Sequence, residues 1–141
     1  MKNLLINIGE KSKKAFSNQI ITKKKDKVLK DYLFLIIKNK RKILRENFKD
    51  VKNAYKKNLK DNLIERLILN EKKILEIINS IKKIIRLKDP TNVVLEKWKQ
   101  PNGLNISKVS IPIGVIGVIY ESRPNVTSDV ASLCFKSGNS V

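Results

Sequence analysis

A short polar segment near the end of the chain carries the side chains best suited to chemistry: Tyr120, Glu121, Ser122, Arg123, Pro124 and Asn125. It follows an apolar run and precedes a helical pattern. Ligands of open α/β sheets bind beyond the carboxyl ends of strands, and the N-terminus of a helix offers free N–H groups to an anion. Arg123 can hold a carboxylate or phosphate with two hydrogen bonds. The segment is therefore a candidate cofactor- or substrate-binding site.

The same side chains also have structural interpretations, which the residue types leave open. Asn125 can donate an N–H to a developing oxyanion, or it can simply cap the helix. Arg123 and Glu121 can bind a ligand, or they can pair with each other on the surface. The chain contains no GxGxxG motif, so the usual dinucleotide-binding fingerprint is absent.

The chain has one cysteine, Cys134, and no histidine. These counts exclude an internal disulfide, metal sites built from cysteine or histidine, and serine–histidine or cysteine–histidine catalysis within the chain. Cys134 lies on the apolar face of a predicted helix, which favours a buried, unreactive thiol over a nucleophile. We therefore expect no metal site.

The elements around the polar segment are expected to be a strand, a loop, a helix and the start of a second strand. Residues 111–120, "IPIGVIGVIY", are rich in Ile and Val and predict a buried strand. Gly114 and Gly117 within it serve either simple packing or the close approach of another backbone. Pro124 suits the first position of the helix, and Gly138 is expected to end it in a left-handed conformation.

The apolar face of that helix is expected to comprise Val126, Val130, Leu133 and Cys134. Asp129 lies early in the helix, where the dipole favours a carboxylate. Ser140 and Val141 have the pattern of a second strand beginning. Because parallel strands need a helical crossover, residues 113–141 predict an incomplete part of a parallel sheet.

Residues 92–111 predict a β-hairpin. Two stretches of alternating apolar and polar residues flank Pro101-Asn102-Gly103, and Asn-Gly between such stretches is a strong hairpin signal. Trp98 lies in the first arm.

The first ninety residues predict helices with one apolar face and a lysine-rich opposite face. One apolar face comprises Leu29, Leu33, Ile36 and Ile37, extended by Ile43 and Leu44. A later one comprises Ile74, Ile77, Ile78, Ile81, Ile84 and Ile85. Asp61 is expected to cap the helix of "NLIERLIL", and Asp89-Pro90 is expected to end the last helical pattern.

The formal net charge of +18 suggests nucleic acid or an anionic membrane as a partner. However, 26 of the 31 basic residues are lysine and five are arginine, whereas proteins that read nucleic acid favour arginine. Helices with a solvated lysine face are the preferred interpretation, so neither partner is expected. A basic helical protein that binds nucleic acid or a membrane surface remains the alternative function.

The N-terminus lacks the longer apolar core of a signal peptide, and the apolar run Tyr32–Ile37 is too short to cross a bilayer. A cytoplasmic location is the expectation.

Residues 111–141, "IPIGVIGVIYESRPNVTSDVASLCFKSGNSV", closely resemble the segment that marks the gamma-glutamyl phosphate reductases, also called glutamate-5-semialdehyde dehydrogenases, of the aldehyde dehydrogenase superfamily. The motifs "KDKVL", "FKDVKNA", "DNLIERLIL" and "LKDP" resemble the N-terminal helical region of that family, in the same order. The resemblance covers nearly the whole chain but only the first part of the family's length.

This resemblance implies an α/β fold with three parts. Residues 1–90 would be the N-terminal helical part of the cofactor-binding domain, and 91–112 a hairpin. Residues 113–141 would be the first strand, loop and helix of an NADP-binding parallel-sheet core, which is incomplete here. The 92–111 hairpin resembles the arm through which superfamily members form homo-oligomers, with Trp98 as an interface residue.

The resemblance also implies a reaction. The family reduces L-glutamyl 5-phosphate with NADPH to glutamate 5-semialdehyde and phosphate in proline biosynthesis, through a cysteine thioester. The family's catalytic cysteine would lie beyond Val141, and Cys134 does not occupy its position. The chain is therefore expected to be an N-terminal fragment with no catalytic residue of its own, inactive alone.

The superfamily places nicotinamide and substrate contacts in the loop that residues 120–125 resemble, and an Asn there stabilises the oxyanion. Counting back from Gly138-Asn139 without gaps places the superfamily's Trp-Asn on Tyr120-Glu121. Matching by residue type places its Pro-Asn on Pro124-Asn125. Both alignments remain open.

Overall fold

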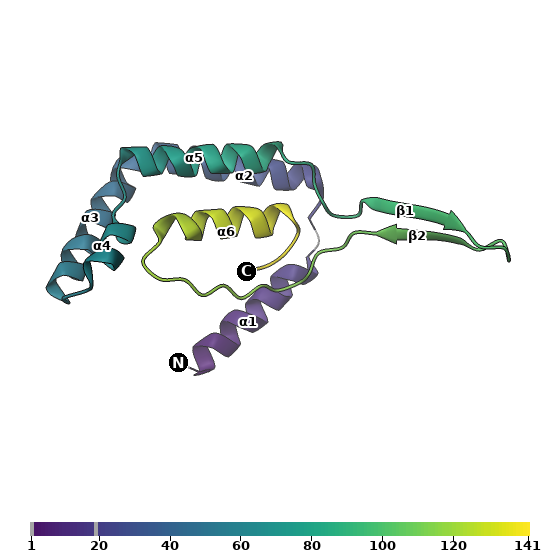
Figure 1. Cartoon of the computed structure of the whole chain (residues 1–141), viewed down its shortest axis with the longest axis horizontal. Helices are drawn as coiled ribbons and strands as arrows, with labels where there is room; N and C mark the ends of the chain where they lie inside the picture. Colours follow the sequence, from purple (N-terminus) through teal and green to yellow (C-terminus); the bar gives the residue numbers. More distant parts are fainter. Residues whose placement is uncertain (1, 19) are drawn as a thin grey trace.

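The computed structural model describes residues 2–18 and 20–141. In these ranges the elements follow the order α1 (Lys2–Ser17), α2 (Thr22–Lys38), α3 (Lys40–Lys56), α4 (Asp61–Leu67), α5 (Glu71–Arg86), β1 (Val94–Lys99), β2 (Asn105–Val109) and α6 (Pro124–Lys136). Figure 1 shows a group of helices from which the hairpin of β1 and β2 projects. None of the described helices is long and apolar enough to cross a membrane.

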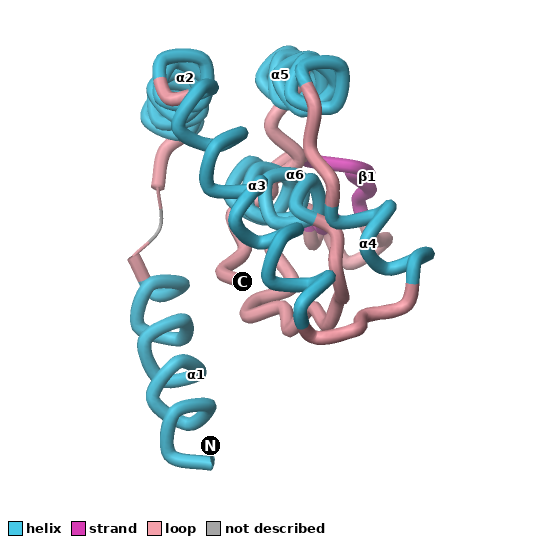
Figure 2. The backbone as a smooth tube through the Cα atoms, turned by 90° about the vertical axis from the view of Figure 1, so that its left-hand side faces the viewer, coloured by secondary structure: helices cyan, strands magenta, loops and turns pink. Residues whose placement is uncertain are grey.

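The core lies where α2, α5 and α6 pack together. Figure 2 shows α2 and α5 side by side with α6 beneath them, while α1 extends away from this group. The predicted isoleucine face of α5 supplies most of the core: its buried residues are Ile74, Ile77, Ile78, Ile81 and Ile84. Burying each such side chain contributes roughly 1.5–3 kcal/mol, so this single face anchors the fold.

The predicted apolar face of residues 29–44 is divided between two helices. Asn39 ends α2 and precedes α3, and its side-chain amide donates to the carbonyl of Leu35 at 2.8 Å. Leu29 and Ile36 are buried as expected, but Ile37 is 48% exposed. The expected extension of the face holds, because Ile43 and Leu44 of α3 pack against the same core cluster as Ile36.

The prediction that Asp61 caps a helix was wrong. Asp61 is the first residue of α4, the capping position belongs to Lys60, and no side chain accepts a hydrogen bond there. Asp61 still lies in the first turn, where its charge complements the helix dipole. The last predicted helix ends at Arg86, shortly before Asp89-Pro90.

The hairpin is confirmed. β1 and β2 pair antiparallel with Trp98 opposite Ile106, and Gly103 in the turn has φ +90°. Apolar side chains on both arms stay exposed, among them Val94, Leu95, Trp98, Leu104 and Val109. Trp98 is 43% exposed and is therefore not a core residue.

Residues 111–120 do not form the buried strand that their composition predicts. Their only ladder contact among the described residues is a parallel bridge between Val115 and Ser140. Ile113 is 86% and Ile119 fully exposed. A strand of a parallel sheet becomes buried only when strands flank it and helices cover both faces. Among the described residues, this bridge is the only strand pairing that residues 111–120 make. Much of the apolar run is therefore exposed to solvent.

Helix α6 begins at Pro124 as predicted, but its buried side differs from the predicted one. Leu133 is 49% exposed, whereas Ser128 and Ser132 are buried together with Cys134. The Oγ atoms of both serines have no hydrogen-bond partner in the described part of the chain. Ser128 and Ser132 have small side chains and are buried in a helix that packs against both α2 and α5.

Candidate functional site

The segment Tyr120–Asn125 begins at the last of residues 111–120 and ends in the first turn of α6. Its side chains are exposed or half-buried, and the hydroxyls of Tyr120 and Thr127 are 2.6 Å apart. Ser122 has φ +50°, a left-handed conformation that is uncommon for a residue with a side chain. The loop thus turns sharply before it enters the helix.

Neither structural interpretation of these residues is found. Arg123 occupies the capping position of α6 and no side chain accepts a hydrogen bond there, so Asn125 is not the cap. Arg123 and Glu121 form no ion pair in the described residues. The first turn of α6 therefore presents its positive dipole end without a capping side chain, although Pro124 carries no N–H and the N–H of Val126 donates to the carbonyl of Arg123 at 3.1 Å.

Asn125 also lines a hollow of about 310 Å³ where α6 meets α4 and α5. In Figure 1 this is the end of α6 nearest α4. The other lining residues are Arg66, Leu69, Lys73, Glu76, Ile77, Ser80 and Asp129. No pattern in the sequence indicated this hollow. The one sequence feature that could have pointed to it is Arg66, because the chain has only five arginines and 26 lysines.

The opposite end of α6 is fixed to the extended segment. The side-chain oxygen of Asn139 accepts from the N–H of Gly114 at 2.8 Å, and Ser140 accepts from the N–H of Ile116 at 2.8 Å. Gly138 has φ +73° as predicted, and a side chain there would meet Pro112 at 3.0 Å. These contacts join residues 112–116, which precede the candidate segment, to the residues that follow the end of α6.

Two buried lysines tie α2 to its neighbours. The ammonium of Lys25 lies 2.9 Å from Asp89, and that of Lys136 lies 2.6 Å from Asp26. Burial alone would raise the pKa of Asp89, but hydrogen bonds from Thr22, Thr91 and Lys25 outweigh it, so the pKa lies well below its usual range. Both pairs support the helices and lie outside the candidate segment.

Cys134 is buried, as predicted, and is 8% exposed. Burial raises the pKa of its thiol, which disfavours the nucleophilic thiolate. It lies on the side of α6 that packs into the protein.

Comparison with solved structures places this fold within a class of reductases. The crystal structure of gamma-glutamyl phosphate reductase from Thermotoga maritima superposes with a TM-score of 0.89 at 39% identity, over 96% of this chain and 33% of that one. The yeast enzyme of the same name, from Saccharomyces cerevisiae, gives a TM-score of 0.87 at 30% identity.

Sequence relatives carry the same name. Gamma-glutamyl phosphate reductase of Nitratiruptor sp. is 56% identical over 82% of this chain and 28% of its own length. That of Caldanaerobacter subterraneus is 46% identical over 94% of this chain and 33% of its own length. No protein-family model matches the chain.

The predicted resemblance is confirmed: nearly the whole chain is similar to a part of gamma-glutamyl phosphate reductase, an oxidoreductase. The chain spans about a third of the length of the relatives that it matches. The comparisons favour this family over the alternative of a basic protein that binds nucleic acid or membranes.

Proposed function

We propose that these 141 residues are the N-terminal part of an enzyme that reduces L-glutamyl 5-phosphate to L-glutamate 5-semialdehyde in proline biosynthesis. The observation that carries the proposal is the 39% identity and TM-score of 0.89 to a solved reductase over 96% of the chain. In the reaction a cysteine thiolate would attack the acyl carbon, the bond from that carbon to the phosphate oxygen would break, and inorganic phosphate would leave. A hydride would then add to the thioester carbon, and the carbon–sulfur bond would break to release the aldehyde and the thiolate.

The proposed cofactor is NADPH, which supplies the hydride when bound. Arg123 and the uncapped first turn of α6 suit a phosphate or carboxylate, so the described residues fit part of such a site. Residues 120–125 would contact cofactor or substrate. Residues 113–141 would begin the cofactor-binding core, 1–90 would be its helical part, and 91–112 its arm.

The nucleophile of this reaction would come from outside these 141 residues. Cys134 is the only cysteine, it is buried, and its thiol pKa is raised. We expect the isolated 141-residue chain to be inactive for this reason. A cytoplasmic location fits a biosynthetic reductase, and the exposed hairpin fits a homo-oligomer.

The test uses the full-length protein that contains this chain. Reduction is followed as loss of NADPH absorbance with L-glutamyl 5-phosphate, and the reverse reaction as phosphate-dependent formation of NADPH from L-glutamate 5-semialdehyde. We expect turnover in both directions, faster with NADP(H) than with NAD(H), and none from residues 1–141 alone. Absence of turnover with either cofactor in the full-length protein would overturn the proposal.

A further inference from the structure

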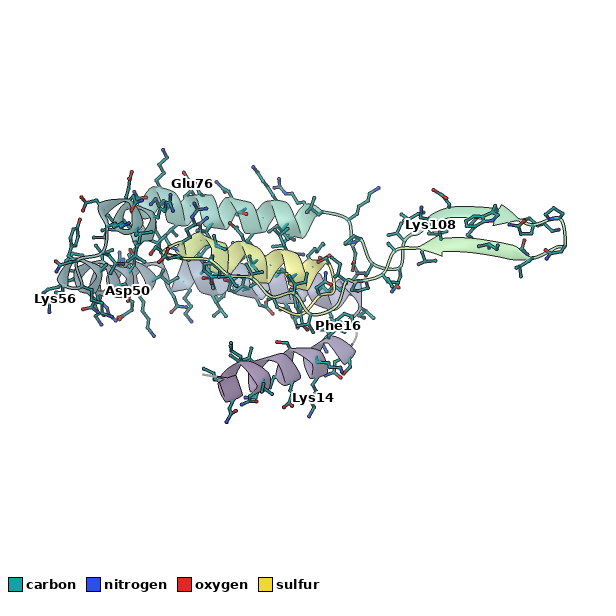
Figure 3. All side chains as sticks on the ribbon, turned by 60° about the horizontal axis from the view of Figure 1, so that its bottom comes forward. Lys14, Phe16, Asp50, Lys56, Glu76 and Lys108 are labelled. Atoms are coloured by element: carbon teal, nitrogen blue, oxygen red, sulfur yellow. The ribbon has the colours of Figure 1, made fainter. Side chains whose placement is uncertain are left out.

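The hollow beside Asn125 has side chains of both charge signs. Two cationic residues, Arg66 and Lys73, and two anionic residues, Glu76 and Asp129, line it together with the apolar Leu69 and Ile77. Its volume of about 310 Å³ is at the lower end of the roughly 300–1,000 Å³ of small-molecule sites. Figure 3 shows Glu76 on the part of α5 that lies beside α6.

These charges do not all neutralise one another. The ammonium of Lys73 donates to the carbonyls of Ile68 and Glu65 at 2.6 and 3.1 Å, so it is already engaged after the end of α4. Arg66 in the last turn of α4 and Glu76 form no ion pair in the described residues. The guanidinium and the carboxylate thus remain available to a ligand.

Asp129 is held in place on the α6 wall. Its Oδ1 accepts a hydrogen bond from the hydroxyl of Ser80 on α5 at 2.8 Å, and its Oδ2 has no partner among the described residues. A carboxylate fixed in this way retains lone pairs for an ammonium group. Glu76 and Asp129 therefore form an anionic part of the hollow, and Arg66 forms a cationic part.

We propose that this hollow binds the zwitterionic α-amino-acid head of the substrate. Arg66 would bind the α-carboxylate with paired hydrogen bonds, and Glu76 and Asp129 would bind the α-ammonium. This rests on the proposed function, because L-glutamyl 5-phosphate carries these two groups at one end and the reactive acyl phosphate at the other. Asn125 belongs both to the hollow and to the segment 120–125, so the reactive end would extend toward that segment.

The test measures oxidation by the full-length protein of L-glutamate 5-semialdehyde and of two truncated aldehydes. Glutarate semialdehyde lacks the α-ammonium and 4-aminobutanal lacks the α-carboxylate. We expect Arg66→Gln to raise the KM for the complete substrate at least tenfold and to leave the KM for 4-aminobutanal unchanged. Glu76→Gln should raise the KM for the complete substrate and leave that for glutarate semialdehyde unchanged. The kcat values should change less than the KM values.

Two exposed residues provide matched controls: Arg41→Gln on α3 and Glu10→Gln on α1 should leave every KM unchanged. If Arg66→Gln raises the KM for all three aldehydes equally, or for none of them, the proposed recognition is wrong while the reductase function stands. If the wild-type protein shows no turnover, the function proposal fails. The hollow is then judged by titration calorimetry with L-glutamate and glutarate, where equal affinities or no binding overturn it.

Discussion

Asp89 shows how single residues hold this helical group together. Its carboxylate and the ammonium of Lys25 are 7% and 3% exposed, and the hydroxyl of Thr22 donates to it at 2.7 Å. Thr91 adds donors from its N–H and its hydroxyl. A buried ion pair stabilises a protein only when its remaining hydrogen-bonding groups are satisfied, and here the donors around Asp89 meet that condition.

The lowered pKa of Asp89 predicts an acid-sensitive contribution to stability. The folded state favours the ionised form, so the contribution is complete above the ordinary carboxyl pKa of about 3.9 and is lost as pH falls below it. Asp89→Asn should lower the free energy of unfolding at pH 7 by about 3–5 kcal/mol, because Lys25 remains buried without its partner. Urea unfolding from pH 7 to pH 3 measures this. The variant should also lose less stability on acidification than wild type.

Asp50→Asn on α3 is the matched control, because Asp50 is exposed. It should change stability by less than about 0.5 kcal/mol. An equal loss in both variants, or an unchanged acid dependence in Asp89→Asn, would contradict the role given to the buried pair.

At the scale of elements, the side chain of Asn47 on α3 binds both the end of α4 and the segment that follows it. Asn47 is 6% exposed, its amide donates to the carbonyl of Leu67 at 2.9 Å, and its oxygen accepts from the N–H of Leu69 at 2.7 Å. Asn47→Ala leaves both backbone groups without this partner, at a cost of roughly 1–3 kcal/mol for each that stays buried. Thermal unfolding should show a lower midpoint than wild type.

Asn53→Ala, on the same helix, replaces an exposed asparagine and should leave the midpoint nearly unchanged. Equal midpoints for the two variants would show that the two hydrogen bonds of Asn47 do not stabilise the packing of α3 against the end of α4. Hydrogen exchange of the Leu69 amide gives a second measurement, since it should become faster only in Asn47→Ala.

Elements fixed by local signals were predictable from the sequence. The isoleucine spacing located α5, Asn-Gly located the hairpin, and Pro124 and Gly138 marked the limits of α6. The exposure of residues 111–120 was not predictable, because the burial of a strand depends on neighbours that lie elsewhere in the chain.

The candidate site was predictable only in part, for the same reason. Residues 120–125 are contiguous and lead into a helix, so their types and order indicated a site. The hollow combines Arg66, Glu76 and Asp129 from three helices. Its charged residues come together only in the folded chain, and no spacing in the sequence indicates that they do.

At the scale of the whole molecule, the hairpin of β1 and β2 lies outside the packed group of α2, α5 and α6. Figures 1 and 3 show it projecting from the helices, with Lys108 on its second strand. An isolated two-stranded hairpin is at best marginally stable in water, and its outer strand edges stay open to pairing. Exposed apolar side chains on such an arm are typical of an interface.

The proposed homo-oligomer predicts that Trp98 is buried against a second copy. Aromatic residues are enriched in the centres of interfaces, and a charge introduced there is desolvated without a partner. Trp98→Glu in the full-length protein should therefore reduce the assembly to monomers at micromolar concentration in analytical ultracentrifugation. Phe48→Glu on α3 is the control, because Phe48 is 70% exposed and lies away from the hairpin. If both variants keep the wild-type mass, the arm is not the interface, and a wild-type protein that is already monomeric would exclude the oligomer itself.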